Sequence, residues 1–200
     1  LVERCRTEWV VNENVNYSMN ILLHGPKGGG KTSIATAICQ ELRIDLHDYP
    51  AHLMEEDFRK AISALPRGGV FLIDEADEIP AMAKTTSHQP KPNEVSKRYL
   101  LDWFDGIESP LGIIGVVCTN KPDAIDDRFL RTGRFKAKIE IGPVPSDDMR
   151  QWLETYYACA ILPDVAFTPM MCSDIIDLAD RSGTVEGFIH VNQAHKHRAN

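Results

Sequence analysis

The sequence predicts a three-layer αβα fold built on a parallel sheet, followed by a small all-helical domain. Short apolar runs rich in β-branched residues alternate with helical stretches through most of the chain, and such runs are typical of strands buried on both faces. After the segment GPVPSDD the strand patterns stop, and only helical patterns follow. We therefore place an αβα core at residues 1–145 and a helical domain at 146–200.

Each predicted element rests on a local pattern. VFLID and IIGVVC are continuously apolar, ILLHG is a short apolar run that ends in glycine, AKIEI alternates, and RIDLHD alternates more weakly. The predicted strands cover residues 21–25, 43–48, 70–74, 113–118 and 137–141. The predicted helices cover residues 31–42, 55–65, 94–105, 148–159, 170–181 and 184–198. Ser146 or Asp147 can cap the fourth of these helices.

The composition bounds the function classes. The 200 residues are 43% hydrophobic and carry a net charge of −7, which argues against a large nucleic-acid-binding surface. Five cysteines, without a CxxC pair, indicate neither a zinc site nor a disulfide framework, so we expect a reducing compartment. No run approaches the ~18 apolar residues of a membrane span. Because the chain begins at Leu1 rather than Met, we expect a longer protein whose other segments would make any membrane contact.

A glycine-rich segment follows the first predicted strand and opens the first predicted helix. GPKGGGKTS matches the phosphate-loop pattern, in which glycines let backbone N–H groups turn toward phosphate oxygens. Lys31 is expected to reach the β- and γ-phosphates of ATP, and the Thr32 hydroxyl to ligate Mg²⁺. The predicted nucleotide-binding residues are Gly25, Pro26, Lys27, Gly28, Gly29, Gly30, Lys31, Thr32 and Ser33.

Two carboxylates end the most apolar predicted strand, in the segment FLIDEADE. Asp74 is expected at the carboxyl edge of the sheet, where it would hold Mg²⁺ through water, and Glu75 is the predicted general base. Residues 74–77 also spell DEAD, which suggests a helicase. That family needs a second full α/β domain, for which this chain has no room. We therefore interpret the spelling as chance, since Asp77 lies beyond the two residues that the chemistry needs.

Taken together, these segments resemble the AAA+ ATPases and, within them, the AAA clade. The most specific stretch is VVCTNKPDAIDDRFLRTGRF, which resembles the clade's fourth strand with its polar sensor and the arginine motif that follows. RYLLDWFDGIES resembles the stretch before that strand, and DIIDLADRSGTVEGFIHVNQAHKHRA resembles the closing helices of the lid. The short spacing between the phosphate loop and the acidic strand, together with TVEGF, looks most like the Bcs-type AAA proteins of the mitochondrial inner membrane.

The resemblance implies roles for three further residues. Asn120 falls on the sensor position, where its amide would orient the hydrolytic water, and Arg131 and Arg134 fall on the two arginine-finger positions. Such arginines act on the ATP of a neighbouring subunit, so the resemblance implies a ring homo-oligomer, a hexamer or heptamer. The alternative is an ion pair of these arginines with Asp126 or Asp127 of the same chain.

We therefore predict an ATPase that remodels a macromolecule, by resemblance a protein. A nucleic-acid motor or loader is one alternative, which the net charge disfavours, and a slow nucleotide-gated assembly scaffold is another, which the intact Glu75 and Asn120 disfavour. We expect the cytoplasm as the compartment, or the mitochondrion if the Bcs-type resemblance holds.

The sequence departs from the family pattern at three places. Lys27 replaces a usual proline in the phosphate loop, and Lys136 replaces a usual aspartate, for which we have no account. The usual aromatic–aliphatic–glycine pore loop is absent, and LHDYPAHLMEE stands in its position. There Tyr49 or Leu53 would grip a substrate, or Tyr49 would pack on the sheet in a turn.

Overall fold

A five-stranded parallel sheet forms the centre of the first part of the structure. In this computed structural model the described residues are 19–49, 54–65, 69–84, 95–106, 112–161 and 165–196. They fall into two units along the chain. One unit ends at Glu140, and the other begins at Ile141 and includes the short segment Pro26–Gly30.

The sheet has the strand order β2-β3-β4-β1-β5, and every described pair of neighbours is parallel. The strands are β1 (Met19–His24), β2 (Leu46–Asp48), β3 (Val70–Ile73), β4 (Ile114–Thr119) and β5 (Ala137–Glu140). All six residues of β4 and all four of β3 are buried, as the continuous apolar runs predicted. All five predicted strands are therefore present in the sheet.

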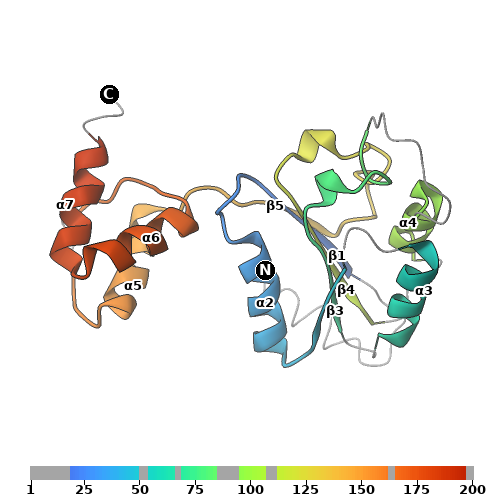
Figure 1. The fold of residues 1–200 in the computed structure, drawn as a ribbon, viewed down its shortest axis with the longest axis horizontal. Helices are drawn as coiled ribbons and strands as arrows, with labels where there is room; N and C mark the ends of the chain where they lie inside the picture. The colour runs from blue at the N-terminus through green and yellow to red at the C-terminus, as the bar shows by residue number, and fades with distance from the viewer. Residues whose placement is uncertain are drawn as a thin grey trace. The chain divides into compact units, whose positions relative to one another are not determined.

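Helices cover both faces of this sheet, which gives the predicted three layers. Figure 1 shows α2 on one face, and α3 with α4 on the other. The helices of this unit are α2 (Lys31–Leu42), α3 (Glu55–Ala64) and α4 (Lys97–Phe104), with two short 3₁₀ turns, η1 (Ala76–Glu78) and η2 (Pro122–Ala124). The architecture of this unit is therefore the predicted three-layer αβα fold.

Two of these elements begin later than the sequence predicted. The weakly alternating run yields only the three residues of β2, because Arg43 takes a left-handed conformation at the end of α2 and pairing with β3 starts at Leu46. Helix α4 starts at Lys97, where the Ser96 hydroxyl caps it by accepting a hydrogen bond from the backbone N–H of Tyr99 at 3.2 Å.

Aromatic side chains fill the core between the sheet and the helices α3 and α4. Phe58 of α3 lies edge-on against Phe71 of β3, with ring centroids 5.5 Å apart, and Trp103 of α4 contacts the same Phe71 at 5.4 Å. Each of these three side chains is 1% exposed or less. Such edge-to-face pairs stabilise the core by more than the apolar area that the rings bury would give alone.

Tyr49 belongs to this core and is not on the surface. Its ring lies edge-on to Phe58 at 4.5 Å, and the residue is only 3% exposed, so burial raises the pKa of its hydroxyl to about 12. Of the two interpretations of this segment, packing on the sheet is confirmed for Tyr49. Leu53, the other candidate, lies outside the described residues.

The second unit contains three helices: α5 (Ser146–Tyr156), α6 (Cys172–Ser182) and α7 (Val185–Lys196). They pack around a small apolar core that includes Leu153, Ile175 and Phe188. The predicted cap of α5 is wrong, because Pro145 precedes the helix and the Ser146 hydroxyl instead accepts a hydrogen bond from the N–H of Phe167. Among the described helices, none combines the length and apolar character that crossing a membrane requires.

Candidate active site

Three adjacent parallel strands carry the candidate catalytic residues at their carboxyl ends. β1 ends before Gly25, β3 ends before Asp74, and β4 ends before Asn120. The pairing of His24 with Thr119 brings the ends of β1 and β4 together. Because parallel strands place their carboxyl ends at one edge, this is the edge at which open α/β sheets bind ligands.

Lys31, the first residue of α2, points back toward this edge. Its ammonium donates hydrogen bonds of 2.8 Å to the carbonyl oxygen of Gly25 and of 2.8 Å to the side-chain oxygen of Asn120. Although it is charged, Lys31 is only 8% exposed. The structure thus brings together the predicted phosphate-binding lysine and the predicted sensor amide, which lie far apart in the sequence.

A hydroxyl and a carboxylate meet beside this lysine. The Thr32 hydroxyl donates a 2.7 Å hydrogen bond to Asp74, whose other carboxylate oxygen accepts from the N–H of Glu75 at 2.8 Å. These oxygens are hard ligands of the kind that Mg²⁺ prefers, and Mg²⁺ usually takes only one or two of them from protein. The donor set fits a Mg²⁺ held with its substrate's phosphates. Among the residues that the structure describes, no cluster of three or more metal-binding side chains indicates another kind of metal site.

The glycines of the phosphate loop adopt the conformations that the motif requires. Gly25, Gly28 and Gly30 have φ values of 137°, 79° and 85°, a region that side-chain-bearing residues rarely adopt. Pro26 and Lys27 are exposed, as is Ser33 in the first turn of α2, and Gly29 is buried. A run of such glycines between a strand and a helix exposes backbone N–H groups to an anion.

Glu75, the predicted general base, has a left-handed backbone conformation. Its φ and ψ are 49° and 43°, and its carbonyl oxygen accepts a hydrogen bond of 2.8 Å from the N–H of Glu78 across the turn η1. The residue is exposed. A non-glycine residue in this region is uncommon, and such strain concentrates at functional sites.

Asp77 was missed by the sequence reasoning, which set it aside as part of a chance spelling. One of its carboxylate oxygens accepts hydrogen bonds from the Thr119 hydroxyl at 2.7 Å and from the N–H of Asn120 at 3.1 Å. The available signal was its place in the acidic segment, two residues after Glu75. That spacing lets the short turn bring it back over the end of β4.

The two candidate arginine fingers have different surroundings. The Arg134 guanidinium forms a two-pronged ion pair with Asp105, with both nitrogen–oxygen distances 2.6 Å, and it also donates to the carbonyl oxygen of Arg128. These hydrogen bonds hold the pKa of Asp105 below its usual range. Arg131 is exposed, and its guanidinium has no hydrogen bond or ion pair with the residues described here.

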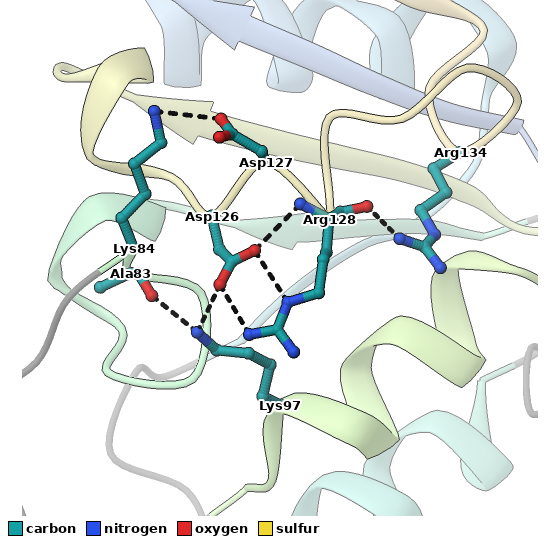
Figure 2. A network of polar contacts seen from close by, with 7 residues as sticks. All are labelled: Ala83, Lys84, Lys97, Asp126, Asp127, Arg128 and Arg134. Atoms are coloured by element: carbon teal, nitrogen blue, oxygen red, sulfur yellow. Dashed lines mark hydrogen bonds and ion pairs between the residues drawn. The ribbon is translucent and has the colours of Figure 1, made fainter.

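Asp126 and Asp127, the alternative partners for these arginines, pair with other residues, as Figure 2 shows. Asp126 accepts hydrogen bonds from Arg128 and from Lys97 of α4, each with a contact of 2.8 Å. These contacts, those from Arg128 first, hold the pKa of Asp126 far below its usual range. Asp127 pairs with Lys84 at 3.0 Å. The alternative of an ion pair between the candidate fingers and Asp126 or Asp127 is therefore not realised.

A buried lysine at a helix start, a hydroxyl–carboxylate pair and an acid after a buried strand define a P-loop nucleoside triphosphatase core. The model of the family described as "ATPase family associated with various cellular activities (AAA)" matches residues 21–143. The chain therefore belongs to the AAA family of ATPases. The prediction of an AAA-clade ATPase, for which the arginine motif was the most specific signal, is therefore confirmed as to the family.

Curated relatives agree with this family. The chain is 29% identical over 183 residues to "Cell division cycle protein 48 homolog" of Archaeoglobus fulgidus, which covers 84% of this chain and 23% of that protein. It is 25% identical over 195 residues to "Probable mitochondrial chaperone bcs1" of Schizosaccharomyces pombe, covering 94% of this chain and 42% of the relative. The chain thus spans less than half of the length of either relative, and a Bcs-type protein is among its relatives.

Proposed function

We propose that this chain binds ATP with Mg²⁺ and hydrolyses it within a ring of identical subunits. The observation that carries the proposal is the convergence of Lys31, Thr32, Asp74 and Asn120 at one edge of the sheet, with contacts of 2.7 to 2.8 Å. These contacts support the roles in phosphoryl transfer that we predict for the four side chains.

The binding residues have two roles, contact with the phosphates and binding of Mg²⁺. The loop glycines present N–H groups to the phosphate oxygens, and the Lys31 ammonium exchanges its contact with Asn120 for the β- and γ-phosphates. Thr32 and Asp74 would hold Mg²⁺, which supplies neutralisation of the charge that develops on the phosphates. Binding would therefore separate Lys31 from Asn120. The pair of Thr32 with Asp74 can persist, because a hydroxyl that gives a lone pair to a cation still carries the proton that it donates to the carboxylate.

Hydrolysis then requires a base and a group that orients water. The Glu75 carboxylate accepts a proton from the water whose oxygen attacks the γ-phosphorus. The bond from that phosphorus to the bridging oxygen breaks, and ADP leaves with the electron pair. Asn120, once released from Lys31, offers its amide to the same water.

The ring follows from Arg131. The residue is exposed, and among the described residues of its own chain its guanidinium has no hydrogen bond or ion pair, only a longer-range attraction to Asp105, which suits a group that acts on the ATP of a neighbour. A contact of this kind is head to tail and closes into a ring when the rotation allows, with six or seven subunits by family resemblance. The helical second unit, α5 to α7, would serve as the lid that moves with the nucleotide.

The substrate of such a ring is most simply a protein, by resemblance to relatives such as the one named a mitochondrial chaperone. The buried position of Tyr49 supports a way of handling the substrate that does not use a pore-loop aromatic from this segment. The mitochondrion follows as the proposed compartment if the Bcs-type relationship extends to the full protein, and the cytoplasm otherwise.

Glu75→Gln provides the test of hydrolysis. The variant keeps the shape of the side chain but cannot accept a proton, so we expect ATP affinity within about 3-fold of wild type and a loss of turnover of at least ~100-fold. Glu78→Gln is the matched control, because Glu78 is an exposed acid on the same turn. Phosphate release at wild-type rate in Glu75→Gln would remove Glu75 as the base.

A further inference from the structure

We propose that Asp77 is a positioning residue for hydrolysis, which fixes the sensor Asn120 and the turn that carries Glu75 in one arrangement. The inference deepens the proposed function and rests on it. It starts from a carboxylate that touches neither Lys31 nor the Thr32–Asp74 pair in the described contacts. Asp77 instead reaches across from the turn η1 to the end of strand β4.

The contact of Asp77 with Thr119 has a fixed direction. The Thr119 side chain is fully buried, and its hydroxyl donates to Asp77 at 2.7 Å while accepting a hydrogen bond from the N–H of Lys121 at 3.1 Å. Since the hydroxyl has a single proton, the carboxylate oxygen of Asp77 must be its acceptor. Removal of that acceptor would leave a buried donor without a partner, which costs more than the hydrogen bond itself contributes.

The same carboxylate oxygen holds the sensor residue. It accepts from the backbone N–H of Asn120 at 3.1 Å, while the side-chain oxygen of Asn120 accepts from Lys31 at 2.8 Å. The carbonyl oxygen of Thr119 in turn accepts from the N–H of Gly25 at 3.2 Å, at the start of the phosphate loop. The backbone of Asn120 therefore stays fixed when its side chain exchanges Lys31 for another partner.

Asp77 also lies within the turn that follows Glu75. The left-handed conformation of Glu75 is one that persists only where the surroundings hold it. Ala76, the first residue of the turn, is fully buried, and Asp77 joins the turn to β4 by its two hydrogen bonds. One carboxylate thus sets the relative position of the base and the sensor, the two groups proposed to act on the same water.

The first test compares Asp77→Leu, which has a similar shape and no acceptor, with Asp77→Asn, which retains an acceptor oxygen. We expect Asp77→Leu to lower kcat by at least ~10-fold, because Asn120 and Glu75 lose their fixed positions. ATP affinity should stay within about 3-fold of wild type, because the groups that bind ATP are all retained. Asp77→Asn should recover most of kcat. If Asp77→Asn is as inactive as Asp77→Leu, its charge or its basicity matters, and the positioning role is overturned.

A double-mutant cycle separates positioning from general damage. When Asn120→Ala has already removed the sensor amide, Asp77→Leu should lower kcat by a clearly smaller factor than it does in the wild type, because part of its effect passes through Asn120. A full and independent loss in the Asn120→Ala background would show that Asp77 does not act through Asn120. That result would overturn the inference.

Amide hydrogen exchange tests the contact without reference to hydrolysis. In the nucleotide-free protein followed by NMR, the N–H of Asn120 should exchange at least ~10-fold faster in Asp77→Leu, and Asp77→Asn should lie closer to wild type. The N–H groups within α3 serve as the control and should keep their rates. Unchanged exchange at Asn120 overturns the inference, whereas a wild-type protein that fails to hydrolyse ATP overturns the proposed function and leaves the exchange test of Asp77 intact.

Discussion

Arg131 and Arg134 stand three residues apart in the same motif, yet the structure predicts that their removal has different consequences. Arg134→Ala breaks a two-pronged ion pair with Asp105, in which the Arg134 side chain is 13% exposed and that of Asp105 is 40% exposed. Arg131→Ala breaks no hydrogen bond or ion pair with the described residues. We therefore expect Arg134 to hold the loop in its own chain while Arg131 acts on the neighbour.

The size of the effect follows from the degree of burial. A fully exposed pair contributes ~0.2–1 kcal/mol, and the removal of one partner of a buried pair costs ~3–5 kcal/mol. For a half-covered pair with two charge-assisted hydrogen bonds we expect Arg134→Ala to lower the free energy of unfolding by about 2 kcal/mol. At a urea slope of ~2 kcal/mol/M this lowers the unfolding midpoint by about 1 M. Arg131→Ala should stay within ~0.5 kcal/mol of wild type.

The assay pairs urea unfolding with steady-state phosphate release, and Asp105→Asn is the matched variant. Arg131→Ala should lower kcat by at least ~100-fold at unchanged stability. Arg134→Ala should lower both stability and kcat, and Asp105→Asn should reproduce this result in weaker form, since the neutral amide retains one acceptor. If Asp105→Asn behaves as wild type and Arg134→Ala lowers only kcat, Arg134 is a second arginine finger. The claim that it holds the loop of its own chain through Asp105 is then refuted.

Two further predictions concern charged groups. Lys31→Met keeps a buried hydrocarbon stem but removes the ammonium, so calorimetry with an ATP analogue should show a loss of affinity of at least ~100-fold, and unchanged affinity would contradict the phosphate-loop assignment. Asp126→Asn should lower the free energy of unfolding by about 2 kcal/mol at neutral pH, because the carboxylate accepts from Arg128 and Lys97. Its pKa is depressed, so the wild type should lose this advantage only as the pH falls below ~4, and a difference that persists in acid would argue against the charge pairing.

The fold was predictable because its central strands are buried on both faces. In β3 and β4 every residue is buried, so the apolar runs are continuous and were recognisable as strands of a parallel sheet. The start of α5 was less predictable, since the Ser146 hydroxyl can cap a helix or accept from a distant N–H, and only the tertiary structure decides. Here it accepts from Phe167.

In the candidate site, too, some residues were predictable from the sequence and others depended on the fold. Lys31, Thr32 and Asp74 belong to short motifs whose residue types follow from phosphate and magnesium chemistry, so the sequence alone predicts them as members of the candidate site. The contacts of Asp77 with Thr119 and of Arg134 with Asp105 join segments far apart in the chain. No local pattern states which distant hydroxyl or carboxylate a side chain will meet, so these partners required the fold.

Subunit mixing tests the central claim, that each active site is completed by Arg131 of a neighbour. Glu75→Gln leaves a dead site with an intact finger, and Arg131→Ala leaves an intact site without its finger, so each variant alone should be inactive. When the two are mixed and allowed to exchange subunits, some interfaces pair an intact site with an intact finger, and part of the wild-type rate of phosphate release should return. If mixing restores nothing and an isolated wild-type monomer hydrolyses ATP at the full rate, the claim is contradicted.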